Sequence, residues 1–367
     1  MSTLAATNLK HESSASNNIV LDSSGNATFA GTAVPSSSFL RNRIINGDMR
    51  IDQRNAGASV TPTDAQYLTD RFVAGLTAAS KFTAQQSSTA PIGFSNSLLI
   101  TSSSAYSVGT NDAFTVSQKI EGFNFADFMW GTANAVTVTL SFWVRSSLTG
   151  TFGGAITNSG DTRSYPFSYA ISVANTWEQK IVTIAGDTSG TWVGSTNGVG
   201  ARVWFGLGVG TTYSGTAGAW VGSAKVSVTG ATSVVGTNGA TFYLTGVQLE
   251  VGSAATPFER RQFGQELMLC QRYYEANVNT ASGGSLGCAI GFSGSVTAGS
   301  TYYAAVNYLV QKRAVPTITL YNANLSAFPS ASAAIATGTT SFLMGGVANG
   351  TNTQGFYFYD FAASAEL

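Results

Sequence analysis

The sequence predicts an all-β protein: a jelly-roll sandwich plus a smaller C-terminal β domain, joined by one short helix and preceded by an extended N-terminal segment. Three observations lead to this fold class. Only 10% of the 367 residues are charged, against roughly 25% in typical soluble domains. Gly, Ser, Thr, Ala and Asn are abundant instead, and these residues suit turns and β-surfaces better than helices. Short runs of alternating apolar and polar residues recur along the chain, separated by turn residues.

Residues 1–38 are polar and rich in small residues, and we expect them to be an attachment or trimerisation segment. Residues 19–22 and 27–29 are typical of two short strands, with a Ser-Ser-Gly-Asn turn between them. So short a polar segment cannot bury enough apolar surface to fold alone, so it must dock onto something larger. The first residues lack the basic start and apolar core of a signal peptide. We therefore expect synthesis in the cytoplasm.

Residues 39–257 are predicted to form the sandwich. The clearest strand covers 136–145, and another covers 202–209; further strands are expected at 180–184 and 241–249. The first two strands each place a row of apolar side chains on one face and a Trp and an Arg on the other. The apolar rows are Val136, Val138, Leu140, Phe142 and Val144 in the first strand, and Val203, Phe205, Leu207 and Val209 in the second.

Residues 258–275 give the one convincing helix. Its apolar stripe consists of Phe263, Leu267, Cys270 and Tyr274, at spacings of four, three and four residues. Three such helices could meet around a symmetry axis, which would make the stripe an oligomer interface. The stripe could equally cover a sheet of its own chain. The two cysteines, Cys270 and Cys288, are expected to be buried thiols.

Residues 276–367 return to β-type patterning and are predicted to form the smaller domain, with strands at 302–310, 315–320 and 356–359. This part contains only four charged residues: Lys312, Arg313, Asp360 and Glu366. The whole chain balances 18 Lys and Arg against 18 Asp and Glu, so nothing favours nucleic acid as a partner, and no run is long enough to insert into a membrane. A chain so poor in charge is expected to cover its surface with copies of itself.

An ordered set of short motifs resembles the domain found in bacteriophage tail fibres and related virion appendages. The motifs include NRIINGDM at 42–49, LSFWVR at 140–145, FYLTGVQLE at 242–250, TPFERR at 256–261 and RAVPT at 313–317. Together they span about residues 39–367. The first three of these motifs are also similar to carbohydrate-binding jelly rolls of the galactose-binding-like type.

This resemblance implies a structural protein of the virion, a homotrimeric tail fibre that binds host surface polysaccharide as a receptor. Residues 1–38 would attach to the phage tail or an adaptor protein, and residues 276–367 would form the trimeric tip. A head fibre or capsid decoration protein is the alternative, and a glycan depolymerase is a weaker one.

Enzymatic activity is not expected, because the single histidine, His11, lies in the polar N-terminal segment and cannot support a His-based triad. Two carboxylate pairs, Asp48 with Asp52 and Glu250 with Glu259, could in principle hydrolyse a glycan. Each has Arg neighbours, which favours a salt-bridged seam where the first and last strands of the sandwich meet. No cofactor is predicted, although a structural Ca²⁺ near Asp48 or Glu250 is a further alternative.

The ligand-binding candidates are Trp143, Arg145, Arg202 and Trp204. An aromatic ring stacks on the apolar face of a sugar, and an arginine donates hydrogen bonds to hydroxyls or carboxylates. The same residue types are favoured at subunit interfaces. Packing under a loop of the same chain is the third possibility.

Overall fold

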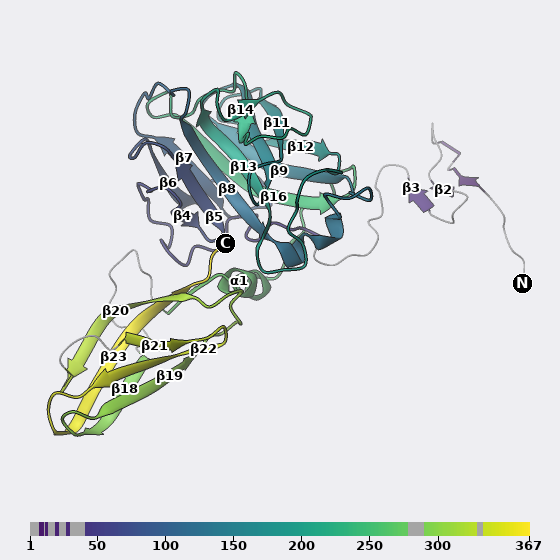
Figure 1. The fold of residues 1–367 in the computed structure, drawn as a ribbon. Helices are drawn as coiled ribbons and strands as arrows, with labels where there is room; N and C mark the ends of the chain where they lie inside the picture. The colour runs from purple at the N-terminus through teal and green to yellow at the C-terminus, as the bar shows by residue number, and fades with distance from the viewer. Residues whose placement is uncertain are drawn as a thin grey trace, which may run out of the picture.

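The computed structural model describes residues 7–10, 12–13, 19–21, 27–29, 41–277, 290–328 and 333–367. A large β-sandwich and a smaller β domain lie on either side of the short helix α1 (Phe263–Gln271) (Figure 1). The predicted all-β fold class, with its jelly-roll sandwich, is therefore confirmed. Within the described residues, no helix has the length and apolar character needed to cross a bilayer.

Two antiparallel sheets form the sandwich. The six-stranded sheet has the order β11-β10-β13-β8-β5-β4 and the five-stranded sheet the order β12-β9-β16-β7-β6. The first comprises β11 (Ser164–Ile171), β10 (Gly150–Asn158), β13 (Val199–Val209), β8 (Ala113–Glu121), β5 (Phe72–Leu76) and β4 (Tyr67–Thr69). The second comprises β12 (Glu178–Ile184), β9 (Val138–Ser146), β16 (Thr241–Val251), β7 (Ser97–Ser102) and β6 (Phe82–Ser87).

The core lies between these sheets and uses the predicted apolar rows. Val138, Leu140, Phe142 and Val144 of β9 are fully buried, as are Val203, Phe205 and Leu207 of β13. Phe142 meets the ring of Phe205 across the sandwich, edge to face, at 5.1 Å between centroids. Each such buried side chain stabilises the fold by about 1.5–3 kcal/mol. The rows of the two sheets face one another, which fixes the direction of every alternate side chain on both strands.

The opening motif of the sandwich runs along β16, its last strand. The amide nitrogen of the Asn42 side chain donates to the Val247 carbonyl at 3.1 Å, and the amide oxygen of the same side chain accepts from the Leu249 N–H at 3.1 Å. A Cβ on Gly47 would lie 2.2 Å from the Val247 carbonyl oxygen, so only glycine fits there. Arg41 pairs with Glu250 at 3.5 Å. The expected salt-bridged seam is present at this edge.

The helix is shorter than the 18 residues predicted, because both ends of the stretch have partners distant in sequence. Residue Gln262 is extended, and the Glu259 N–H before it donates to the Gln248 side chain of β16 at 2.8 Å. After the helix, β17 (Tyr274–Ala276) pairs with β23 (Asn352–Ser364). Tertiary pairing therefore overrides the local helical periodicity at each end.

The C-terminal β domain contains two small sheets around a second core. β23 pairs with β17, β18 (Ile290–Val296) and β20 (Thr317–Ser326), and β22 (Ser341–Val347) lies between β19 (Thr301–Asn307) and β21 (Ala333–Thr337). The core includes Phe342, Met344, Tyr357, Tyr359 and Phe361.

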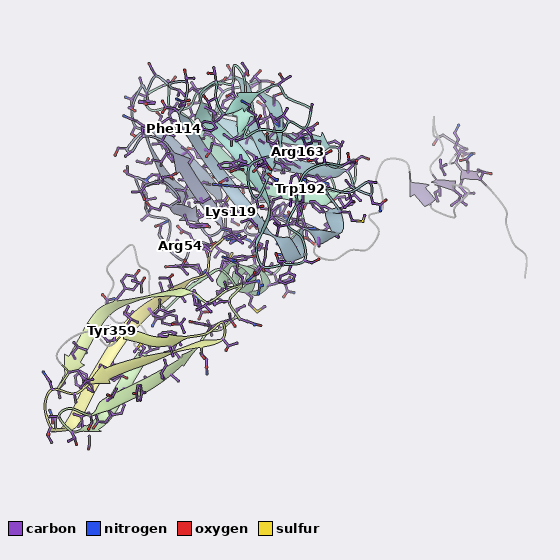
Figure 2. The ribbon with its side chains drawn as sticks, viewed as in Figure 1. Arg54, Phe114, Lys119, Arg163, Trp192 and Tyr359 are labelled. Carbon is purple, nitrogen blue, oxygen red and sulfur yellow. The ribbon has the colours of Figure 1, made fainter. Side chains whose placement is uncertain are left out.

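Charged side chains tie this domain to the sandwich. Arg272 donates two hydrogen bonds to Glu121 of β8, at 2.9 and 2.6 Å, and the Tyr273 hydroxyl donates to the same carboxylate at 2.6 Å. Glu366 pairs with Arg54 at 3.0 Å and also with the buried Arg71. Figure 2 shows Arg54 at this junction, on the edge of the sandwich nearest the C-terminal domain. The two units are thus connected by buried ion pairs as well as by the chain.

In the N-terminal segment, β2 (Ile19–Leu21) and β3 (Ala27–Phe29) pair antiparallel, as the predicted hairpin requires. β1 (Asn8–Leu9) adds to β2. The turn at 22–26, His11 and Cys288 lie outside the described residues.

Candidate functional site

The outer face of the six-stranded sheet carries two of the predicted ligand-binding residues. Arg202 and Trp204 project from β13 on the side opposite its core row. The strand pairing places Lys119 of β8 directly opposite Arg202, and Ser117 directly opposite Trp204. On the other flank, β10 places Thr157 beside Arg202. Arg202, Lys119 and Trp204 line the floor of a cavity of about 380 Å³.

Trp204 is a buried wall of this cavity and not an open stacking surface. Its side chain is 8% exposed and packs with Ala155 and Val226, while its indole N–H donates to the Thr157 hydroxyl at 3.0 Å. The Arg202 guanidinium lies 3.5 Å from the Trp204 ring centroid. The Arg202 Nε donates to the Ser117 hydroxyl at 3.0 Å. Stacking and this hydrogen bond together fix the plane of the guanidinium.

The cavity floor carries two neighbouring cations. Burial lowers the pKa of Arg202 to about 10, against the opposing effect of Asp161, Tyr67 and Asp64. Burial also lowers the pKa of Lys119, and the positive charges of Arg202 and Arg71 lower it further. Both shifts have the sign expected when a positive charge is desolvated.

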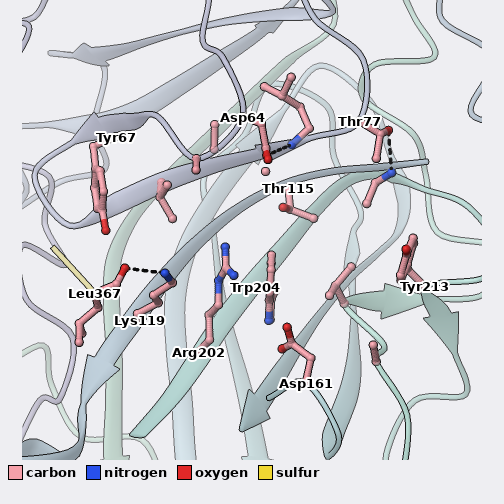
Figure 3. Close-up of a pocket in the computed structure, with 18 residues that line it drawn as sticks. Asp64, Tyr67, Thr77, Thr115, Lys119, Asp161, Arg202, Trp204, Tyr213 and Leu367 are labelled. Atoms are coloured by element: carbon pink, nitrogen blue, oxygen red, sulfur yellow. Dashed lines mark hydrogen bonds between the residues drawn. The ribbon is translucent and has the colours of Figure 1, made fainter. Parts of the chain in front are cut away.

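The remaining walls are largely apolar, with carboxylates at the rim. Leu76, Ala224, Val226 and the backbone of Gly75 supply apolar surface, and Leu367 closes one side. The Lys119 ammonium donates to a main-chain oxygen of Leu367 (Figure 3). Asp64 and Asp161 lie at the periphery, where Asp64 accepts the Leu76 N–H at 3.0 Å. Apolar walls with a few converging polar groups are typical of a small-molecule binding site.

Trp143 and Arg145 lie on the outer face of the other sheet, so the four predicted residues do not form one surface. The strands belong to different sheets whose core rows face each other, and their Trp and Arg side chains therefore point in opposite directions. Arg145 lies over the ring of Tyr243 at 4.8 Å and donates to the Asn175 carbonyl at 2.8 Å. The candidates thus divide between two separate surfaces, and for Trp143 and Arg145 ligand binding remains a prediction.

A second, smaller hollow of about 260 Å³ surrounds Trp143. Phe94, Phe258 and Arg260 line it, with the Arg260 guanidinium 4.6 Å from the Phe94 ring centroid. Gly246 has a φ of +60°, and a Cβ there would lie 2.8 Å from Phe94 and 2.9 Å from Trp143. The glycine thus permits the two rings to approach closely.

The carboxylates considered for catalysis or calcium binding are engaged by the protein itself. Asp48 pairs with Arg50, and Asp52 accepts the N–H groups of Asn55 at 3.1 Å and Gly57 at 2.9 Å. Glu250 accepts the Thr256 N–H and hydroxyl at 2.8 and 2.6 Å. Glu259 accepts the backbone N–H groups of residues 41 and 42. Among the described residues, no group of three or more His, Cys, Asp or Glu is arranged to hold a metal.

The predicted interface stripe on α1 divides between core and surface. Cys270 is a fully buried free thiol packed against Ile45 and Ile51, and Tyr274 is 6% exposed. These two side chains face their own chain, so they cannot line a contact with another copy. Phe263 is 56% exposed. Leu267 lies partly buried beside the cluster around Cys270. For Phe263 the interface remains a prediction.

The sequence patterns did not identify Lys119, Asp64 or Asp161 as site residues. The charge of Lys119 on the outer side of an alternating strand, 113–121, was the available signal. Lys119 can be recognised as a site residue only from its pairing with Arg202, and that pairing depends on the order of strands in the sheet.

No family model matches the chain, and no curated protein matches it either. Solved structures with a similar arrangement include the enzymatically active domain of tailspike protein 4 from bacteriophage CBA120, at 13% identity and a TM-score of 0.32. That match covers 58% of this chain and 22% of the tailspike chain. TmCBM61 in complex with β-1,4-galactotriose matches at 8% identity and a TM-score of 0.30, covering 58% of this chain and 99% of its own.

The family 11 carbohydrate-binding module from Clostridium thermocellum, in complex with a mixed-linked tetrasaccharide, matches at 8% identity and a TM-score of 0.28. The match covers 55% of this chain and all of the module. Several of these neighbours are thus carbohydrate-binding modules. At such TM-scores the likeness carries no argument about the residues or the ligand of this chain.

Proposed function

We propose that this protein is a structural component of a bacteriophage virion, a homotrimeric tail fibre that projects from the particle and binds a glycan on the host surface without cleaving it. The observation that carries the binding role is the cavity over Arg202, Lys119 and Trp204. A sugar ring presents C–H groups that suit its apolar walls and hydroxyls that suit its donors and rim carboxylates. Weak single contacts become strong on a rigid trimer that engages several sugars at once.

The virion role rests on the ordered motifs between residues 42 and 317 and on the low charge of the chain. A head fibre or capsid decoration protein would share these features. A reconstruction of the phage particle locates the protein: density at the tail supports the proposal, and density at the capsid overturns the tail-fibre assignment.

The binding role is tested with the full chain and purified host surface polysaccharide, by isothermal titration. Arg202→Gln removes the positive charge and the fork of N–H donors from the cavity floor. We expect the affinity for the polysaccharide to fall about tenfold or more, because a charge-assisted hydrogen bond contributes roughly 1.5–3 kcal/mol. Arg145→Gln, on the opposite sheet, is the matched control and should bind normally. Circular dichroism confirms that both variants fold.

Two results would contradict this assignment. If Trp143→Ala abolished binding while Arg202→Gln left it intact, the glycan would bind in the hollow beside Phe94. If incubation with polysaccharide released reducing ends steadily, the chain would be a depolymerase and not a binding protein alone.

A further inference from the structure

Two cations lie side by side on the floor of the cavity. Like charges placed directly opposite one another on antiparallel strands are destabilising, yet Arg202 and Lys119 occupy such a pair. Many of the other cations in the described residues pair with carboxylates, whereas some, such as Lys81, Arg145 and Arg260, also have no carboxylate partner. The paired ones in the described part are Arg41, Arg43, Arg50, Arg54, Arg71, Arg163, Lys180, Arg261, Arg272 and Lys312. Arg202 and Lys119 pair with no Asp or Glu side chain among the described residues.

The two cations also have donors to spare. Arg202 uses Nε for Ser117, and its two terminal nitrogens have no acceptor within the described protein. The stacking on Trp204 holds the guanidinium plane in place, which leaves the fork of N–H groups presented to the cavity. Figure 3 shows this fork beside the Lys119 side chain. Lys119 uses one donor for Leu367, and an ammonium group has three.

From this arrangement we infer that the cavity selects a sugar that bears a carboxylate, such as a uronic acid. This inference rests on the proposed glycan binding and specifies its ligand class. A carboxylate matches the arginine fork in two parallel hydrogen bonds and brings a negative charge to a fork that has no carboxylate partner among the described residues. A neutral sugar would satisfy the donors without bringing that charge.

The rim carboxylates restrict the ligand further. Asp64 is exposed and Asp161 partly so, and both face the cavity. They can accept hydrogen bonds from sugar hydroxyls, but they disfavour a densely charged group such as a phosphate dianion. A single carboxylate directed at Arg202, with hydroxyls toward the rim, satisfies all four charged groups.

The test compares native and carboxyl-reduced forms of the same polymers on one array. The probes are polygalacturonate, alginate and hyaluronan, each printed before and after reduction of its carboxyls to primary alcohols, with galactan and dextran as neutral polymers. We expect the full chain to bind at least one acidic polymer and to lose roughly 10- to 100-fold in affinity when that polymer is reduced. The affinity of the Arg202→Gln variant should fall by a similar factor for the native polymer and should be unchanged for the reduced polymer.

The outcomes separate this inference from the proposed function. Equal binding to native and reduced polymers, or binding to galactan or dextran alone, overturns acid selection and leaves glycan binding standing. No binding to any probe, with the host polysaccharide still bound in the titration, overturns acid selection alone, and no binding to the probes or to the host polysaccharide overturns both.

The melting temperature of a Lys119 variant, measured together with its binding, distinguishes a role of Lys119 in ligand binding from a purely structural role. Lys119→Gln keeps a donor for Leu367 and removes one of the two repelling charges. The variant should melt at the same or a higher temperature than the wild type and bind the acidic polymer several-fold more weakly. A lower melting temperature would show that the charge of Lys119 supports the fold, contrary to the inference. Arg145→Gln is the control for both measurements.

Discussion

The junction between the sandwich and the C-terminal domain holds several ionisable side chains away from water. Asp70 is 1% exposed, and its carboxylate accepts the Gln53 N–H at 3.0 Å, while the nearest cation, Arg54, lies at 3.8 Å. Desolvation outweighs these contacts and raises the pKa of Asp70 from 3.8 to about 6. The folded protein therefore holds the Asp70 proton more tightly than the unfolded chain does.

This residue makes the stability depend on pH in a defined direction. Between about pH 4 and pH 6 the unfolded chain loses the proton first, so the contribution of Asp70 to the free energy of unfolding falls as the pH rises. A shift of two pH units corresponds to about 3 kcal/mol. Asp70→Asn cannot ionise, so its free energy of unfolding relative to wild type should rise by up to that amount from pH 4 to pH 7. Urea titrations of both proteins at pH 4 and pH 7 measure this difference in the free energy of unfolding. The same difference at both pH values would contradict the raised pKa of Asp70.

At the scale of the element, alternation in the sequence was enough to find four strands of the sandwich, β9, β12, β13 and β16, but not β8, β10 or β11. The rows of β9 and β13 face the core as predicted, because period-two patterning sets the buried face. The assignment of each strand to a sheet depends on partners far away in sequence. For this reason Trp143 and Trp204, which look equivalent in the sequence, lie on opposite faces of the sandwich, and the Arg202–Lys119 pair could not be predicted. The ends of α1 were misplaced for the same reason.

The region just after α1 depends on one buried ion pair. The Lys312 ammonium is completely buried and donates to Glu275 at 2.5 Å and to the Gln271 carbonyl at 2.6 Å. Glu275 belongs to β17, and it also accepts the Leu309 N–H at 3.1 Å. The pair thus connects the end of the helix, β17 and the loop after β19.

Removal of one partner should be costly. Lys312→Met leaves the Glu275 carboxylate buried without its cation, and such a loss destabilises proteins by roughly 3–5 kcal/mol. Lys312→Met combined with Glu275→Gln removes the unpaired charge and should recover a large part of the loss. Thermal unfolding of the two variants and the wild type provides the comparison. Equal stability of the single variant and the wild type would show that this pair contributes nothing net to the junction.

At the scale of the whole molecule, the charges of the C-terminal domain gather where it meets the sandwich. Lys312 pairs with Glu275, Glu366 pairs with Arg54, and Arg313 donates to the carbonyls of residues 197, 365 and 366. Asp360 is fully buried and accepts from Asn322 at 2.9 Å. The part of the domain beyond this junction therefore presents an uncharged surface, and Tyr303 and Val347 expose about half of their side chains there.

A neutral surface of this kind favours association with copies of itself, since no like charges oppose it. Tyr303 of β19 and Val347 of β22 lie on one face of the three-stranded sheet, because Val347 is opposite Thr301, two residues from Tyr303. Tyr303→Lys with Val347→Lys would bring like charges together around a symmetry axis, so we expect this variant to be monomeric and the wild type trimeric. Light scattering coupled to size-exclusion chromatography measures both.

The wild-type trimer should persist in 1 M NaCl, because no exposed ion pair holds this face. Ile92→Lys, at a fully exposed position on the sandwich, is the matched control and should remain trimeric. A wild-type chain that elutes as a monomer, or a double variant that stays trimeric, would show that this face does not mediate the assembly.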